Sequence, residues 1–204
     1  MNASTRRKQL RQLVERGKTV AALGATDALS AKLIEAHGFE CVYIGSYATA
    51  ASRFGLPDTG SLALPEIVEQ ARTIGNAVQV PVIADAEGGF HDAANLWRTV
   101  QAFEQAGVAA IHIEDHAFGK HAAVAQKLRP ADEAAARIRA AVEAREDPDF
   151  LVVARSDAFW VCGDLEDAIA RFKADGALPA GTQEFEKLLG YDAFAARARK
   201  YGEA

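Results

Sequence analysis

Three short apolar runs in this chain each end in charged side chains, and a helix-like segment separates each run from the next. The runs are rich in β-branched residues and cover residues 80–84, 108–113 and 150–154. This alternation is typical of parallel strands in a series of βαβ units. In a parallel barrel all strands end at one rim, and that rim carries the catalytic residues. The sequence therefore predicts an α/β fold with one functional site where these strands end.

Carboxylates follow the first two runs and an arginine follows the third, at Asp85, Glu87, Glu114 and Arg155. Such a group predicts a metal ion bound beside an anionic substrate. Asp85 lies too far ahead of the helix expected near residue 93 to cap it, so metal ligation is favoured over capping. An unpaired Arg155 would be costly at the end of an apolar strand, so a carboxylate partner is expected. That partner is a substrate, or it is Asp157 or Glu114 within the chain.

The remaining elements follow from helical spacing and from turn residues. Helices are expected over residues 5–16, 65–76, 93–105, 131–145 and 165–173, strands over 19–23 and 41–44, and a long loop of small residues over 45–60. Asp27 is expected to cap another helix, which Gly38 ends. Leu29, Leu33 and Ile34 form one face of that helix. Five strand–helix units in succession indicate an α/β fold with a parallel sheet.

The pattern stops after Lys173, because no further strand can be recognised in the sequence. A complete eight-unit barrel typically needs about 250 residues, and this chain shows five units. Residues 1–174 are therefore predicted to form a partial (β/α) barrel that carries the metal site, and residues 175–204 a C-terminal helical tail. The units that would close the barrel are absent, as if a block were missing between Lys173 and Gly176.

Composition limits the partners of the chain. The net charge is −5 and no basic cluster runs along one segment, so we expect no nucleic-acid partner. No apolar run approaches the roughly 20 residues that cross a bilayer, so no membrane partner is expected. Cys41 and Cys162 have neither metal spacing nor a disulfide framework, which indicates the cytoplasm. Open edge strands expose unpaired backbone groups, so we expect a homo-oligomer.

Five sequence motifs occur in an order that resembles the isocitrate lyase / phosphoenolpyruvate mutase superfamily. They are Asp27-Ala28-Leu29-Ser30-Ala31, Gly55-Leu56-Pro57-Asp58, Asp85-Ala86-Glu87-Gly88-Gly89-Phe90, Ile111-His112-Ile113-Glu114-Asp115 and Ala154-Arg155-Ser156-Asp157-Ala158. The resemblance runs from about Leu10 to Lys173 and resumes in the tail at Gly181. It implies a modified TIM barrel that binds Mg²⁺, with Mn²⁺ as an alternative, and a small 2-oxo or 2-hydroxy carboxylate. The chemistry that it implies is cleavage or formation of a C–C or P–C bond through an enolate.

The resemblance also assigns roles to individual positions. The metal positions are Asp85 as a direct ligand, with Asp58, Glu87 and Glu114 around the water shell of the ion. The substrate positions are Arg155, which pairs with a carboxylate, Tyr43, and the backbone around Gly45, Ser46 and Tyr47. The catalytic positions are Arg155, Glu114 and His121. From the residues alone, His121 and the adjacent Lys120 are either acid/base groups on a loop or solvated surface.

Two departures from the family pattern bear on which of the family's reactions is expected. The lyases of the family carry a loop of the form Lys-Lys/Arg-Cys-Gly-His after the fourth strand, but residues 118–126 contain no cysteine. Glu87 stands where the family usually has Asp. The leading interpretation is a Mg²⁺-dependent lyase-type enzyme, other than a standard isocitrate or methylisocitrate lyase. The alternatives are a metal-dependent aldolase of another barrel family and a shortened, catalytically impaired family member.

Overall fold

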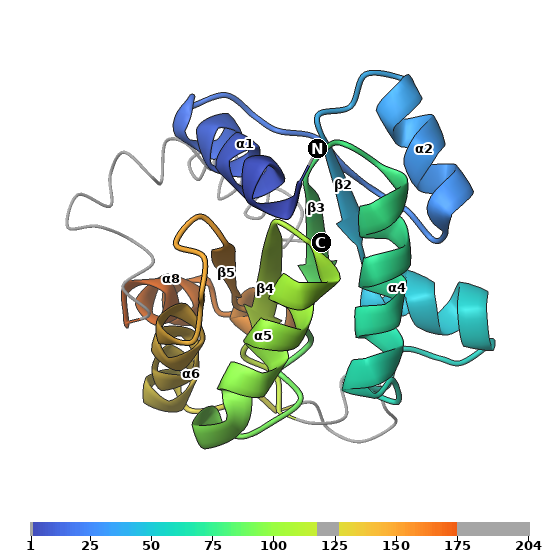
Figure 1. The fold of residues 1–204 in the computed structure, drawn as a ribbon. Helices are drawn as coiled ribbons and strands as arrows, with labels where there is room; N and C mark the ends of the chain where they lie inside the picture. Colours follow the sequence, from blue (N-terminus) through green and yellow to red (C-terminus); the bar gives the residue numbers. More distant parts are fainter. Residues whose placement is uncertain (1, 118–126, 175–204) are drawn as a thin grey trace, which may run out of the picture.

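The computed structural model describes residues 2–117 and 127–174, which form one five-stranded parallel sheet with helices packed against it (Figure 1). The strands lie side by side in chain order and are β1 (Ala22–Gly24), β2 (Cys41–Ile44), β3 (Val82–Asp85), β4 (Ala110–Glu114) and β5 (Leu151–Arg155). Every neighbouring pair is parallel. All five carboxyl ends therefore lie at one edge of the sheet, as the sequence predicts.

Helical segments precede, connect and follow the strands. They are α1 (Ala3–Glu15), α2 (Ala28–Ala36), α3 (Ser46–Thr49), the π-helical turn η1 (Ala50–Phe54), α4 (Leu64–Ala77), the 3₁₀ turn η2 (Ala93–Asn95), α5 (Leu96–Ala106), α6 (Ala131–Glu143), α7 (Ala158–Cys162) and α8 (Leu165–Ala174). Asp27 caps α2 as expected, because its carboxylate accepts a hydrogen bond from the Ser30 N–H at 2.8 Å. Gly38, just beyond α2, has a φ of 82°, the left-handed conformation that ends helices.

The strand register divides the sheet into two faces. One face carries the apolar side chains that pack against the helices, including Ile44, Ala84 and Ile111, which are fully buried with Ile67 of α4 and Phe103 of α5. The alternate residues of each strand, such as Asp85 and His112, lie on the other face. Because this face would point into a closed barrel, it is the face on which polar side chains can gather at the strand ends.

Helix α1 covers the amino-terminal ends of the strands, opposite their carboxyl ends. The buried Arg6 side chain donates to the carbonyl oxygens of Gly75 at 2.8 Å, Val78 at 3.0 Å and Gly107 at 3.0 Å. Arg7 donates to the Glu104 carbonyl at 2.6 Å. These contacts fix the amino-terminal edge of the sheet and leave the carboxyl edge for function.

The structure corrects one expectation about local elements. Residues 45–60 are not a continuous loop, because α3 and η1 form between residues 46 and 54. Within α2 only Ala31 is buried, and Leu29 and Leu33 are 69% and 52% exposed. Ala31 and the partly buried Ile34 form the side of α2 that packs against the core.

The predicted α/β fold with a parallel sheet is confirmed, and within the described residues the sheet does not close into a barrel. There β1 and β5 form the two edges of the sheet. Residues 175–204 lie outside the described part of the chain, so the helical tail and the boundary at residue 174 stay predictions. Across residues 2–117 and 127–174, no helix is both long enough and apolar enough to span a bilayer.

Candidate active site

The polar residues predicted for the site lie together on the inner face of the sheet. The register aligns Asp85 of β3 with His112 of β4, and Glu114 of β4 with Arg155 of β5. Partners in a parallel ladder point to the same face, as do residues two apart in a strand. Asp85, His112, Glu114 and Arg155 therefore share one face near the carboxyl edge. Asp85 and Glu114 are 2% and 3% exposed.

Asp85 is held by the loop after β2 and by its own loop. Its Oδ2 atom accepts hydrogen bonds from the Ser46 hydroxyl at 2.8 Å and the Ser46 N–H at 3.1 Å. Its Oδ1 atom accepts from the Glu87 N–H at 2.8 Å. The cap of the next helical turn is Asp92, whose carboxylate accepts from the Asn95 N–H at 2.9 Å. Capping by Asp85 is thus excluded, and its carboxylate is fixed at the centre of the site.

Three buried carboxylates make a candidate metal centre. One oxygen each of Asp85, Glu87 and Glu114 lies within 4.8 Å of the others. Three anions this close and this buried repel one another unless a cation compensates them. The donors are all oxygen, which suits a hard cation such as Mg²⁺. The residues therefore fit the ion that the family resemblance implies.

Asp58 joins this group through Ser46. The Ser46 hydroxyl lies 3.4 Å from Asp58 Oδ1 as well as 2.8 Å from Asp85 Oδ2. Asp58 is also buried, at 8% exposure. Its contact with Ser46 places it beside the three carboxylates rather than among them, as expected for a residue that binds the water shell of an ion.

The loop that carries Glu87 has an unusual backbone. Glu87 and Phe90 have positive φ values of 51° and 61°, which non-glycine residues rarely adopt. Gly89, between them, has a φ of 93°, and a Cβ there would lie 2.4 Å from the Leu96 Cδ1 atom. The Thr99 hydroxyl donates to the Gly89 carbonyl at 2.7 Å. Strain of this kind tends to occur where the backbone must place a functional side chain, here the Glu87 carboxylate.

Arg155 has the carboxylate partners that its position requires. It donates through Nε to Asp157 Oδ1 at 2.9 Å and through Nη2 to Asp157 Oδ2 at 3.1 Å, and its Nη1 lies 3.3 Å from Glu114 Oε2. Burial lowers the pKa of Arg155, but these carboxylates outweigh burial and raise the pKa above its ordinary value. With 39% of its side chain exposed, Arg155 is a fixed cation that a substrate can reach.

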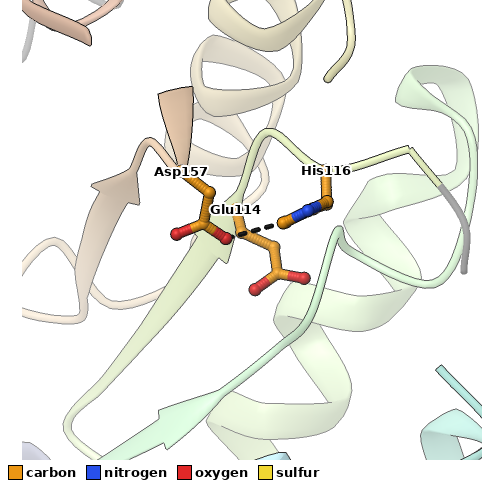
Figure 2. A group of neighbouring side chains, drawn as sticks. All are labelled: Glu114, His116 and Asp157. Carbon is orange, nitrogen blue, oxygen red and sulfur yellow. Dashed lines mark hydrogen bonds and ion pairs between the residues drawn. The ribbon is translucent and has the colours of Figure 1, made fainter. Parts of the chain in front are cut away.

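His116 completes the group drawn in Figure 2, in which its ring points toward Asp157. The His116 Nδ1 atom lies 2.7 Å from Asp157 Oδ2. Burial raises the pKa of Asp157, but the hydrogen bonds from His116 and Arg155 outweigh it and lower the pKa to about 2. The ionised carboxylate can only accept, so Nδ1 carries the proton. The sequence argument did not single out His116; its position two residues after Glu114 is the signal that could have done so.

The other predicted positions are placed as follows. The Tyr43 hydroxyl lies 2.7 Å from His112 Nε2, and the two rings stack, so both belong to the inner face. Gly45 precedes α3, and the Ser46 N–H donates to Asp85. The Tyr47 side chain is 68% exposed, so any part that it has in the site comes from its backbone. His121 lies outside the described residues and stays a prediction.

A cavity of about 710 Å³ opens beside the carboxylates, and Glu87, Gly88, Glu114 and His116 form part of its wall. This volume lies within the range of about 300–1,000 Å³ that is usual for small-molecule sites. The arrangement provides a place for a cation, a fixed arginine beside it and space for a small ligand.

Comparison with known proteins agrees with this geometry. Residues 10–181 match the phosphoenolpyruvate phosphomutase family. The chain therefore belongs to this family, within the isocitrate lyase / phosphoenolpyruvate mutase superfamily. This assignment overturns the alternative of an aldolase from another barrel family.

Individual relatives share the fold but differ in chemistry. The chain is 39% identical to 2,3-dimethylmalate lyase of Eubacterium barkeri over 88% of this chain and 66% of that one. It is 35% identical to oxaloacetate decarboxylase of Paraburkholderia xenovorans over 92% of this chain and 65% of that one. The structure of phosphonopyruvate hydrolase with oxalate and Mg²⁺ superposes with a TM-score of 0.79 at 33% identity, over 87% of this chain and 60% of that one. The chain thus spans about half to two thirds of the length of its relatives.

Proposed function

We propose that this chain carries the metal and substrate site of a Mg²⁺-dependent enzyme that cleaves or forms a C–C or P–C bond in small 2-oxo or 2-hydroxy carboxylates through an enolate. The observation that carries the proposal is the meeting of three buried carboxylates with a partly exposed arginine on one face of the sheet. The named relatives act on small acids of this kind. Mn²⁺ would accept the same oxygen ligands.

Each residue has a part in this proposal. Asp85 would hold the ion directly, and Glu87, Glu114 and Asp58 would hold its water shell. The ion, when bound, supplies electrostatic stabilisation of negative charge on an enolate oxygen. Arg155 would bind the carboxylate of the substrate in a fixed orientation, because Asp157 holds two of its nitrogens. Tyr43 and the backbone at Gly45, Ser46 and Tyr47 would border the same ligand.

The sequence of residues 118–126 lacks the cysteine of the family's lyases, so isocitrate or methylisocitrate cleavage is not proposed. His121 in this segment stays the proposed acid/base group. A cytoplasmic homo-oligomer is proposed as well, because Cys41 and Cys162 are both free and two sheet edges are open within the described residues. A catalytically impaired protein is the second candidate, because the five strands described here do not close a barrel.

Thermal unfolding in a two-by-two design tests the proposal. Oxalate is the probe, because it is a planar mimic of the enolate of pyruvate. We expect oxalate to raise the melting temperature only when Mg²⁺ is present, since the ion and Arg155 each bind part of the same anion. A ligand at 100 times its dissociation constant stabilises by about 2.7 kcal/mol, a shift of several degrees. Identical curves in all four conditions, at millimolar ligand, would favour the impaired protein.

A further inference from the structure

Helix α6 carries an arginine on the side that faces the core. Small and apolar residues such as Ala134 and Ile138 are buried on that side, and Arg137 is buried with them at 3% exposure. A long cation is rarely buried on the core side of a helix unless its charged end finds hydrogen-bond acceptors. The atoms that the guanidinium group contacts therefore decide what Arg137 does.

Those acceptors belong to the loop that follows β3. The Arg137 Nη2 atom donates to the carbonyl oxygen of His91 at 2.6 Å and to the carbonyl oxygen of Gly88. A Cβ atom at Gly89 would lie 3.0 Å from the same nitrogen. A single nitrogen atom of α6 thus holds two carbonyl oxygens of this loop, one on each side of Gly89.

The two hydrogen bonds lie next to the strained residues of the loop. Glu87, directly before Gly88, has a φ of 51°, and Phe90, directly before His91, has a φ of 61°. Residues other than glycine keep such angles only where the surrounding contacts hold the backbone firmly. Arg137 supplies one such contact after each of the two strained residues, so its hydrogen bonds stabilise the conformation of the loop.

Glu87 connects this loop to the candidate metal centre, because its carboxylate is one of the three that lie together there. The Glu87 N–H donates to Asp85 Oδ1 at 2.8 Å, and the Glu87 carbonyl accepts from the Glu114 N–H at 2.9 Å. These bonds fix Glu87 to the ends of β3 and β4. The chain that follows Glu87 is held by Arg137 of α6.

We propose that Arg137 is a positioning residue of the metal centre. Through the carbonyl oxygens of Gly88 and His91 it holds the loop after β3 in the conformation that places the Glu87 carboxylate beside the other two. This inference rests on the proposed function, in which Glu87 holds the water shell of Mg²⁺. Without the guanidinium group the loop can relax toward negative φ angles, and the Glu87 carboxylate then moves away from the ion.

The test measures Mg²⁺ affinity by isothermal titration calorimetry and stability by urea unfolding. Arg137→Met keeps the apolar part of the side chain and removes the donors. Arg137→Lys keeps a cation whose one nitrogen atom has three N–H donors, so it can donate to both carbonyl oxygens as Nη2 does.

The matched control is Arg6→Met. Arg6 is also buried, at 6% exposure, and it also donates to backbone carbonyl oxygens, but at the amino-terminal ends of the strands. Its replacement removes the same chemical group and leaves the loop after β3 intact. The control therefore separates a general loss of stability from a loss of the metal centre.

Arg137→Met should bind Mg²⁺ at least about tenfold more weakly than the native protein, the effect typical of residues that orient metal ligands. Arg137→Lys should bring the affinity back to within about threefold of the native value. Arg6→Met should lose stability, as Arg137→Met does, and bind Mg²⁺ like the native protein. If Arg137→Met does not fold, Arg137→Gln, whose shorter side chain cannot hold both carbonyl oxygens, takes its place with the same expected result.

Three results would overturn the positioning role. They are native Mg²⁺ affinity in the Met or Gln variant of Arg137, no recovery of affinity in Arg137→Lys, and an equal loss of affinity in Arg6→Met. A native protein that does not bind Mg²⁺ would instead overturn the proposed function on which the inference rests.

Discussion

The contact between Asp157 and Arg155 gives a quantitative test of how the substrate arginine is positioned. Asp157 accepts hydrogen bonds from Arg155 Nε at 2.9 Å, Arg155 Nη2 at 3.1 Å and His116 Nδ1 at 2.7 Å. Asp157→Asn replaces one carboxylate oxygen by an NH₂ group. In this buried position the NH₂ group would point at an N–H donor of His116 or Arg155, and no hydrogen bond can form between two donors. Breaking a buried ion pair costs about 3–5 kcal/mol. Water can hydrate the partly exposed Arg155, so we expect the free energy of unfolding to fall by about 2 kcal/mol, less than for a fully buried pair.

For a domain of about 200 residues, that loss lowers the melting temperature by about 4–8 °C. It also frees Arg155 to rotate, so oxalate affinity at saturating Mg²⁺ should fall about tenfold. The control is Asp167→Asn, which removes a carboxylate that pairs with Arg171 at 2.8 Å but is 35% exposed on α8. Because Asp167 is more accessible to water than Asp157, its replacement should cost less, about 0.5–1 kcal/mol. If both variants melt alike and bind oxalate like the native protein, Asp157 does not position Arg155.

Three further predictions concern stability and assembly. The pKa of Asp157 is lowered from 3.8 to about 2, so its stabilising effect should be complete above about pH 4 and lost as the pH falls toward 2. The difference in unfolding free energy between the native protein and Asp157→Asn should shrink over that range, and a constant difference would contradict this. Gly89→Ala should destabilise the protein by about 1–3 kcal/mol more than Gly163→Ala, as measured by urea unfolding. Both glycines have positive φ, but only at position 89 would the new Cβ atom clash with Leu96. Light scattering should give at least twice the chain mass of 21.8 kDa, because two sheet edges are open within the described residues; a stable, compact monomer would contradict assembly.

The fold could be predicted largely from the order of apolar runs and helical spacing. The strand at Cys41–Ile44 matches its expected bounds, and the helix expected at 165–173 is found at Leu165–Ala174. These segments are periodic and end in clear turn residues, so local sequence determines them. The turns α3 and η1 were missed because their sequence is rich in small residues and has no apolar stripe. The exposure of Leu29 and Leu33 could not be predicted, because periodicity identifies one face of a helix but does not say which face meets the sheet.

The candidate site could be predicted in part for the same reason. Parallel strands place their carboxyl ends together, so the sequence alone brings Asp85, Glu114 and Arg155 to one edge. The partner of Arg155 had to stay open, because Asp157 and Glu114 were equally plausible until their distances were known. The contact of Arg137 with the carbonyl oxygens of Gly88 and His91, in the loop after β3, could not be anticipated. It depends on how α6 packs against the β3 loop, which no local pattern records.

The most direct test of the metal centre is isothermal titration calorimetry with Mg²⁺. It measures the Mg²⁺ affinity of the native protein, of Asp85→Ala and of Asp92→Ala. Asp85 lies among the buried carboxylates, whereas Asp92 is an exposed residue that caps the turn η2 and serves as the control. The proposed site predicts one Mg²⁺ bound by the native protein and by Asp92→Ala with similar affinity. Asp85→Ala should bind it at least about tenfold more weakly, because it loses the direct ligand. Equal Mg²⁺ affinity in all three proteins would contradict a metal centre at the carboxyl edge of the sheet.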